Sequence, residues 1–321
     1  MSRLKHLQFP DYPLPDGTKQ TIHLSYEIFG QPLHQAPLVL VNHALTGNST
    51  VAGEKGWWKN LIGWDKVIDL NRYTVVAFNI PGNGYEANEE HLIHNYTSFT
   101  TALIGTLFWK GLEVLGVTHL YAIIGGSLGG NIAWEMTFQK PNAVERLIPI
   151  ATSYQASDWL IGQVHVQEAI LSHSSHPLED ARKHAMLLYR TPDSLVQKFN
   201  RKHLQEEQEY AIENWLNYHG NVLKERFQLV AYRLLNHLLK TTGTQLTEDF
   251  LLAFAQTSPT AIHIIAVDTD YMFTQREQKQ AYQKMALHKA NLTYQEIQSI
   301  HGHDAFLLEY DQLNHLLEQI F

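Results

Sequence analysis

The chain has 321 residues, of which 44% are apolar, and its formal net charge is −8. This length and apolar fraction suit one α/β domain with a sizeable buried core. The basic residues form no run and there is no cysteine, which excludes a nucleic-acid-binding stripe, disulfides, thiolate metal sites and a cysteine nucleophile.

The first residues show no apolar run after their charged positions, and no stretch of the chain approaches the roughly 20 apolar residues that span a membrane. We therefore expect a cytoplasmic, soluble protein that does not contact membranes or nucleic acid.

Short apolar runs alternate with stretches of helical spacing along much of the chain. Two nearly continuous apolar runs, at 37–42 and 73–80, are typical of strands that are covered on both faces. The predicted strands are 22–29, 37–42, 73–80, 120–124, 146–152, 261–267 and 292–300. The helices predicted between and after them are 98–115, 131–139, 276–289 and 305–320. This alternation indicates a mostly parallel sheet flanked by helices.

The middle of the chain, residues 157–250, has a different character. It is helical in spacing, richer in charge and histidine, and has few β-type runs. We expect a helical lid inserted into an α/β core that consists of residues 1–156 and 251–321. Such a lid would lie over the carboxyl ends of the strands, where open α/β sheets bind ligands.

A G-x-S-x-G pattern, Gly125-Gly126-Ser127-Leu128-Gly129, lies between a predicted strand and a predicted helix. This is the context of the nucleophile elbow of the α/β-hydrolase fold, in which a strained turn exposes the serine Oγ and larger residues at the glycine positions would collide with backbone. The alternative is an ordinary glycine-rich turn that cradles a phosphate. A Walker-type loop is excluded because no G-K-[ST] follows. We expect Ser127 to be a nucleophile.

A serine nucleophile needs a base, and the base needs a carboxylate that orients it. In this fold the chain order is Ser, Asp, His. Asp268 and Asp270 follow one predicted strand, and His301 and His303 follow the next, so two candidates compete for each role. His303 is favoured as the base because it follows a glycine and opens the last helix. We expect no metal, because a binuclear H-x-H-x-D-H site would need a histidine at the position of Phe306.

The tetrahedral intermediates of acyl transfer need two backbone N–H donors. One is expected from Leu128, the residue after the nucleophile. The other is expected from the loop after the strand at 37–42, which begins Asn42-His43-Ala44-Leu45-Thr46-Gly47. A plain strand-ending turn is the alternative interpretation of that loop.

Several motifs together resemble the homoserine O-acetyltransferase family of α/β-hydrolase-fold enzymes, in order, from about residue 36 to the end. They are His43-Ala44-Leu45-Thr46-Gly47-Asn48, Gly125-Gly126-Ser127-Leu128-Gly129-Gly130, Ala151-Thr152-Ser153-Tyr154-Gln155-Ala156-Ser157, Tyr189-Arg190-Thr191, Tyr218-His219-Gly220 with Glu225-Arg226-Phe227, and Gly302-His303-Asp304-Ala305-Phe306-Leu307.

The resemblance implies ping-pong transfer of an acetyl group from acetyl-coenzyme A to the hydroxyl of L-homoserine, in methionine biosynthesis. The roles that it assigns are nucleophile (Ser127), acid (Asp270), base (His303), oxyanion donors (N–H of Leu45 and Leu128) and acceptor-binding residues (Arg182, Tyr189 and Asp304). Acetyl-coenzyme A is then a co-substrate and no bound cofactor is implied. The resemblance also implies a homodimer that pairs through the lid helices.

The sequence departs from the family in being shorter, and the segment 78–96 lacks the family's longer loop. This leaves the acyl donor and the acceptor open, so a succinyl-coenzyme A-using or serine-using acyltransferase is an alternative. A serine esterase on the same scaffold and a non-catalytic binding module are two others. From the residues alone, Arg182 would be a solvated helix residue, and only the resemblance gives it a binding role.

Overall fold

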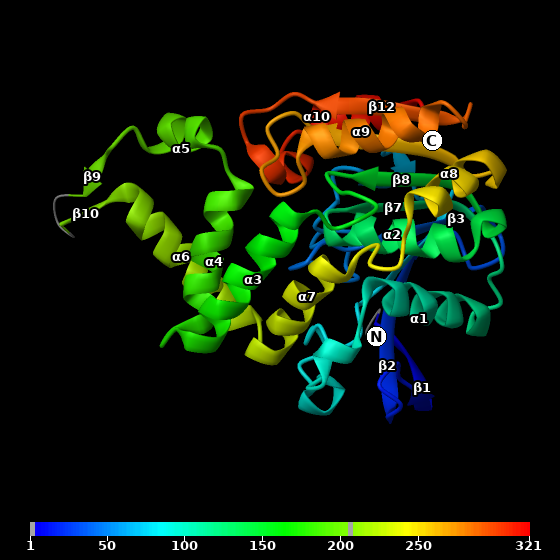
Figure 1. Ribbon diagram of the computed structural model, residues 1–321, viewed down its shortest axis with the longest axis horizontal. Coiled ribbons are helices and arrows are strands. Elements are labelled where there is room, and N and C mark those ends of the chain that lie inside the picture. The colour runs from blue at the N-terminus through cyan, green and yellow to red at the C-terminus, as the bar shows by residue number, and fades with distance from the viewer. Residues whose placement is uncertain (1–3, 205–207) are drawn as a thin grey trace.

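The computed structural model describes residues 4–204 and 208–321 (Figure 1). Within these residues, eight strands form one sheet in the order β1-β2-β6-β3-β7-β8-β11-β12. The pairs β1/β2 and β2/β6 are antiparallel, and the other neighbours are parallel. The strands are Lys5–Pro13 (β1), Lys19–Gly30 (β2), Leu38–Asn42 (β3), Thr74–Phe78 (β6), Leu120–Gly126 (β7), Val144–Ile150 (β8), Ala261–Val267 (β11) and Leu292–Ile297 (β12). The seven predicted strands are all present in this sheet.

In the described part of the chain, two further pairs of short strands lie outside the main sheet: Ile62–Gly63 (β4) with Ile68–Asp69 (β5), and His203–Leu204 (β9) with Glu209–Tyr210 (β10). The helices are Thr101–Val114 (α1), Leu128–Gln139 (α2), Asp158–His173 (α3), Pro177–Tyr189 (α4), Pro192–Phe199 (α5), Ala211–Arg226 (α6), Leu229–Thr241 (α7), Glu248–Thr257 (α8), Gln275–Ala286 (α9) and Tyr310–Glu318 (α10). The 3₁₀ helices are Glu89–His91 (η1), Tyr96–Ser98 (η2), Pro141–Ala143 (η3) and Gly302–Leu307 (η4). Over the described ranges, no helix is both long and apolar enough to cross a membrane.

The central strands bury side chains on both faces of the sheet. In β3, Leu38 and Leu40 join the hydrophobic cluster that includes α1, α2 and α9, whereas Val39 and Val41 join the cluster that includes α10 and residues 51–70. Successive side chains of a strand point to opposite faces, so a strand covered on both sides needs apolar residues at every position. This explains the continuous apolar runs in the sequence.

The edge strand β1 is absent from the sequence prediction. Among its residues only Phe9 is buried, and Pro10 interrupts the strand where its pairing with β2 shifts register. The next residue, Asp11, has a left-handed φ of 49°. Edge strands tolerate proline and irregular pairing because one side of their backbone forms no hydrogen bonds with a neighbouring strand. The sequence of an edge strand therefore need not show the alternating apolar pattern that predicts a strand.

The single helix predicted over 305–320 is wrong. The structure has the 3₁₀ helix η4 and then α10, separated by Leu308 and Glu309, which leave helical geometry with ψ values of −42° at φ −125° and of 56°. Packing explains the break: the buried Phe306 lies against Gly126, where an added Cβ would come within 2.5 Å of its ring. The chain therefore holds a tight turn at η4 before it can start α10.

Helices α3 to α7 form the insertion and lie to one side of the sheet (Figure 1). They pack on one another closely: a Cβ at Gly220 of α6 would lie 3.0 Å from the carbonyl oxygen of Glu179 in α4. The predicted lid boundary at 250 falls inside α8. That helix packs on the core through Phe254, whose ring centroid lies 4.8 Å from that of Phe138. We call α3 to α7 the lid from here on.

The lid leaves and rejoins the core at neighbouring points. The N–H of Ala156, in the outgoing segment, donates to the carbonyl of Thr242 in the returning segment at 3.0 Å. The Gln155 side chain donates to the Gly243 carbonyl at 3.1 Å. The returning segment is fixed to the core as well, because Gly243 N–H donates to the buried carboxyl of Glu135 at 2.9 Å. Burial raises the pKa of Glu135.

Candidate active site

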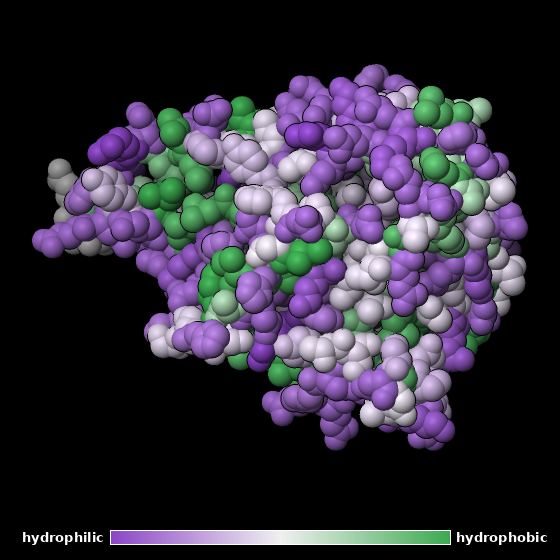
Figure 2. All heavy atoms as spheres, viewed as in Figure 1, coloured by the Kyte–Doolittle hydropathy of each residue, from purple (hydrophilic) through white to green (hydrophobic). Residues whose placement is uncertain are grey.

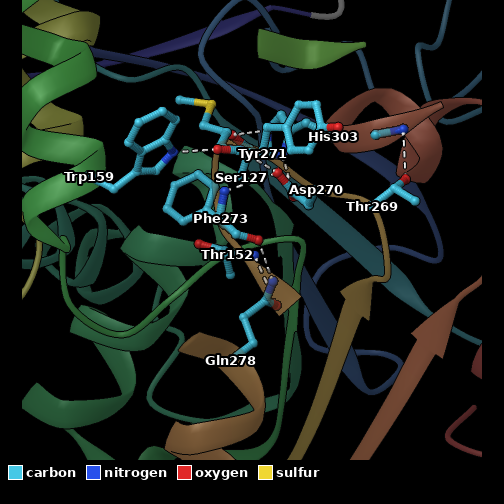
Figure 3. Close-up of polar contacts among 11 residues, drawn as sticks. Ser127, Thr152, Trp159, Thr269, Asp270, Tyr271, Phe273, Gln278 and His303 are labelled. Carbon is cyan, nitrogen blue, oxygen red and sulfur yellow. Dashed lines mark hydrogen bonds and ion pairs between the residues drawn. The ribbon is translucent and has the colours of Figure 1, made fainter. Parts of the chain in front are cut away.

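Ser127 lies in a strained turn between β7 and α2. Its φ of 55° and ψ of −127° fall where non-glycine residues rarely occur. The strain is held in place because the N–H of Ser127 donates to the carbonyl of Ile150, in the neighbouring strand β8, at 2.9 Å. The turn directs the Ser127 side chain toward the imidazole of His303 (Figure 3).

The glycines around Ser127 are required by contacts with backbone and with one ring. A Cβ at Gly125 would lie 2.4 Å from the carbonyl carbon of Gly129, and a Cβ at Gly129 would lie 2.2 Å from the carbonyl oxygen of Asn42. The G-x-S-x-G pattern thus needs glycine at these positions because a larger side chain would collide with backbone atoms. The second of these contacts also brings the loop after β3 directly against the start of α2.

The structure brings together the three residues expected to act as nucleophile, base and acid (Figure 3). His303 Nε2 lies 2.9 Å from Ser127 Oγ, and His303 Nδ1 lies 2.7 Å from Asp270 Oδ2. Asp270 follows β11 and His303 lies in η4. In this arrangement Nδ1–H donates to the carboxylate, so Nε2 is free to accept the Ser127 proton.

The competing candidates make other contacts. Asp268 Oδ1 accepts from the N–H of Ser299 at 2.9 Å, and His301 Nδ1 lies 2.9 Å from the guanidinium of Arg190. Asp270, by contrast, has its second oxygen fixed: Oδ1 accepts from the N–H of Met272 at 2.7 Å and of Phe273 at 2.9 Å. Two backbone donors on one oxygen leave the other oxygen directed at His303.

Aromatic rings surround the imidazole of His303. The ring centroids of Tyr189, Phe273 and Phe306 lie 5.6, 5.6 and 5.5 Å from its own. His303 is 3% exposed and Ser127 is 4% exposed. Hydrogen bonds within such a dry site are stronger than in water, and the rings leave the imidazole little freedom to turn.

Two backbone N–H groups are available for an oxyanion. Leu128 is the first residue of α2, where a helix leaves its N–H groups without an internal acceptor. Within the described part of the chain, neither the Leu128 N–H nor the Leu45 N–H donates a hydrogen bond. Because Gly129 touches the backbone of Asn42, the loop that carries Leu45 lies beside the start of α2. The structure thus places both predicted donors at the same end of the sheet as Ser127.

His43 is a residue whose role the sequence did not reveal. Its Nδ1 lies 2.8 Å from the carbonyl of Ala44, and its Nε2 accepts from the N–H of Ile80 at 3.0 Å. Burial lowers the pKa of His43 to about 4. The neutral ring, with its proton on Nδ1, therefore ties the loop that carries Leu45 to the segment after β6. In the sequence, His43 stood out only as the first residue of the His43–Asn48 motif, and nothing indicated that its ring would hold this loop.

We predict that His43 makes the protein less stable in mild acid. In the unfolded chain its pKa is about 6.5, so between pH 6.5 and 4 the unfolded state binds the extra proton and stability falls as the pH falls. The full difference corresponds to on the order of 3 kcal/mol. Urea unfolding of His43→Gln should show a shallower loss of unfolding free energy over this range, after its deficit at pH 8 is subtracted. If the unfolding free energy of His43→Gln falls with pH as steeply as that of the unaltered protein, His43 is not the group responsible.

A cavity of about 230 Å³ opens between the lid and the loop after β3. Arg182, His219 and Arg226 line it from the lid, opposite Ala44 and Gly47. Burial and nearby cations, Arg182 first among them, lower the pKa of His219 to about 4. At neutral pH the positive charge of the cavity therefore comes from its two guanidinium groups.

The three expected acceptor-binding residues lie near one another and near the base. The guanidinium of Arg182 lies over the Tyr189 ring, 5.6 Å from its centroid, and the Tyr189 ring in turn contacts His303. Asp304 follows His303 in η4. Burial raises the pKa of Asp304, while the charges of His303 and Arg182 act in the opposite direction. Arg182 thus faces a cavity instead of standing free on the outer helix face.

Among the described residues, no group of three or more His, Cys, Asp or Glu side chains has the geometry to hold a metal ion. The geometry supports chemistry by a serine nucleophile, an imidazole base, a fixed carboxylate and backbone donors.

Comparison with known proteins identifies relatives of this chain. The family model of the alpha/beta hydrolase fold matches residues 37–224, which confirms the predicted fold. The chain is 30% identical over 305 residues to a homoserine O-acetyltransferase of Cyclobacterium marinum, covering 88% of this chain and 84% of that protein. It is 30% identical over 346 residues to a homoserine O-acetyltransferase of Salinibacter ruber, covering 97% and 95%.

Solved structures with the same fold include both transferases and esterases. A homoserine O-acetyltransferase from Bacillus anthracis superposes with a TM-score of 0.86 at 18% identity, covering 100% of this chain and 98% of that one. Esterase E22 gives the same TM-score at 18% identity, with 100% of each chain covered. At this identity the superpositions establish the fold, and the acceptor of the reaction has to be argued from the site.

Proposed function

Because the chain belongs to the homoserine O-acetyltransferase family within the α/β-hydrolase fold, we propose that it transfers an acetyl group from acetyl-coenzyme A to the hydroxyl of L-homoserine. The transfer proceeds through an acetyl ester on Ser127, so that the donor leaves before the acceptor reacts.

The observation that carries the proposal is a pair of opposite charges beside the base. The positive charge of Arg182 acts on the carboxyl of Asp304, and Asp304 adjoins His303 in sequence. Free homoserine carries a carboxylate and an ammonium group. A guanidinium fork matches the first in bidentate geometry, and a carboxylate matches the second. Water, the acceptor of an esterase, requires neither charge.

In the first half-reaction, His303 Nε2 takes the proton of Ser127 as Oγ attacks the thioester carbonyl. The N–H groups of Leu45 and Leu128 stabilise the oxyanion, and Asp270 stays ionised and stabilises the imidazolium. When the intermediate collapses, the C–S bond breaks and the coenzyme A sulfur takes the proton from His303. The acetyl group remains on Ser127.

In the second half-reaction, the homoserine hydroxyl gives its proton to His303 Nε2 while its oxygen attacks the acetyl carbonyl. Collapse breaks the bond to Ser127 Oγ, which recovers the proton from His303. Arg182 and Asp304 hold the acceptor so that its hydroxyl lies beside the base, and Tyr189 adds a hydrogen bond. The product is O-acetyl-L-homoserine, an intermediate of methionine biosynthesis.

An esterase is the second candidate, and the superposition with esterase E22 is the observation that favours it. It would use the same first half-reaction and then water. A succinyl donor or a serine acceptor would fit the same scheme as well.

Free thiol released from acetyl-coenzyme A, with and without L-homoserine, tests the proposal. A transferase should release thiol much faster with homoserine, because deacylation then has an acceptor. An equal rate with and without homoserine would establish the esterase. Repeating the assay with succinyl-coenzyme A and with L-serine identifies the donor and the acceptor.

Two variants locate the acceptor site in the same assay. Arg182→Ala and Asp304→Ala should form the acetyl-enzyme normally yet lose the stimulation by homoserine, since the first half-reaction does not involve the acceptor. Lys183→Ala is the matched control, because Lys183 is the next cation on α4 and pairs with Asp180 at 3.2 Å. Retained stimulation in the Arg182 variant would remove Arg182 from the site.

Pairing of two copies through the lid helices stays a prediction, which the mass of the protein in solution would test. Exposed apolar residues on the lid support it: Val196 is 64% exposed and Tyr218 is 60% exposed. Figure 2 shows hydrophobic residues gathered over the lid around α5. An acyl-coenzyme A and a free amino acid are cytoplasmic metabolites, so we also place the enzyme in the cytoplasm.

A further inference from the structure

A short lid segment is hydrogen-bonded to the loop that carries the proposed base. This segment, Tyr189 to Thr191, joins α4 to α5, and the loop at 299–303 runs into η4, of which Gly302 and His303 are the first two residues; in Figure 1 the two ribbons lie near each other. Thr191 Oγ1 donates to the carbonyl of Ile300, and Arg190 Nη2 lies 2.9 Å from His301 Nδ1. We call these two contacts the clasp.

The lid side of the clasp is buried and fixed. Arg190 is 9% exposed and Thr191 is 4% exposed. Thr191 caps α5, where its hydroxyl accepts from the N–H of Ser194 at 3.1 Å, and Arg190 Nε donates to Ser194 Oγ at 3.3 Å. Buried side chains with this many partners hold one geometry, so a displacement of the lid would be transmitted to the loop.

The core holds the same loop at two other points. Asp268 accepts from the N–H of Ser299 at 2.9 Å, and the hydroxyl of Thr269 accepts from the N–H of Gly302 at 3.2 Å. These contacts fix the loop on either side of Ile300 and His301. The residues between them are held from the lid.

The close approach of the two segments requires a glycine just before the base. Gly302 has a φ of +66°, and a Cβ there would lie 2.9 Å from the carbonyl oxygen of Tyr189. Next in the chain comes His303, whose imidazole contacts the Tyr189 ring at a centroid distance of 5.6 Å. The lid thus touches the loop at four consecutive residues that end with the base.

We propose that Arg190 is a positioning residue: through its hydrogen bond to His301, the lid sets the orientation of His303, so the Ser127–His303–Asp270 set is fully aligned only when the clasp is closed. A guanidinium only donates, so His301 Nδ1 accepts and its proton lies on Nε2. The proposal rests on the base role that we propose for His303. It gives His301 a function distinct from that of the base.

The test compares the rates of both half-reactions in Arg190→Met. Methionine is also unbranched, but it has no hydrogen-bond donor in its side chain. The base serves both steps, so acetylation by acetyl-coenzyme A and transfer to homoserine should slow by the same factor, about 10- to 100-fold, as expected for a small misplacement of a catalytic group. KM for homoserine should not change. Arg190→Lys, which retains a donor, should recover part of the loss.

Substitutions of His301 make the test specific. His301→Asn offers an amide oxygen as acceptor and should keep most of the rate, whereas His301→Phe should lose as much as Arg190→Met. In the Arg190→Met/His301→Phe double variant the losses should not add, because both remove one interaction. Additive losses, or equal rates for His301→Asn and His301→Phe, would overturn the proposal. If Arg190→Met does not fold, the His301 pair and Arg190→Lys carry the comparison.

Two further controls distinguish a failure of this proposal from a failure of the proposed acetyl transfer. Arg233→Met removes another lid arginine, which pairs with Glu168 in the lid, and should leave both half-reactions unchanged. All variants are also assayed with p-nitrophenyl acetate, whose cleavage needs the aligned triad but neither coenzyme A nor homoserine. Loss of ester cleavage in Arg190→Met supports the clasp even if coenzyme A proves not to be the donor. Unchanged ester cleavage, or a loss confined to transfer, overturns it.

Discussion

Replacing Ser127 with alanine should abolish the acetyl adduct on the protein and lower turnover by on the order of 10⁶-fold, the scale of loss when a triad serine is removed. Ser127 Oγ is the group that His303 Nε2 contacts at 2.9 Å. The strained turn around it exists to present that oxygen, and alanine presents none. Intact-protein mass after brief exposure to acetyl-coenzyme A, without an acceptor, measures the adduct directly.

Ser153→Ala is the matched control for this measurement. Ser153 is also a largely buried serine at the carboxyl side of the sheet, and its carbonyl accepts from Asn131 at 2.6 Å, a contact that alanine keeps. This variant should form the adduct as the unaltered protein does. An adduct that persists in Ser127→Ala would assign the nucleophile to another residue.

Replacing Asp270 with asparagine should lower turnover by about 10⁴-fold while leaving the fold intact. The reason lies in the two N–H donors, from Met272 and Phe273, that hold Oδ1. They would hold the amide oxygen of asparagine in the same place, which turns its NH₂ toward His303. Nδ1 would then have to accept, the proton would move to Nε2, and Nε2 could no longer take the proton of Ser127.

Asp268→Asn is the comparison that decides between the two aspartates. The carboxylate of Asp268 accepts a hydrogen bond from the N–H of Ser299, and an amide oxygen can accept it equally. Steady-state turnover of this variant should stay within a few-fold of the unaltered protein, since a single neutral hydrogen bond is retained. If Asp268→Asn is the more damaging of the two, the acid is wrongly assigned.

The fold was predictable to the extent that packing leaves a pattern in the sequence. Strands β3 and β6 are covered on both faces, so every position is apolar and the run stands out. Strand β1 packs one buried phenylalanine at an edge and leaves no such run. The break between η4 and α10 depends on where Phe306 packs, against a glycine 180 positions earlier in the chain. Local spacing contains no information on that contact.

The residues of the site also differ in how far local sequence could predict them. The G-x-S-x-G turn is local, so the sequence pointed to Ser127 directly. The choice of His303 over His301 depends on which imidazole turns toward Ser127, and the choice of Asp270 over Asp268 on which carboxylate turns toward His303. Alternatives two residues apart look alike in sequence. His43 and Arg190 were missed as supporting residues because their partners are distant: Ile80 in one case and His301 in the other.

The paired ends of the lid have a consequence for how such enzymes diversify. Because the outgoing and returning segments are hydrogen-bonded to each other at Ala156 and Thr242, the core sees the same two neighbouring attachment points whatever lies between them. Domain insertions are best tolerated where the ends lie close together. Duplicated genes can therefore vary this segment, apart from the residues at 189–191 that contact the loop of the base, while the reacting groups on the sheet are inherited unchanged. One ancestral chemistry can in this way acquire new acceptors without being rebuilt.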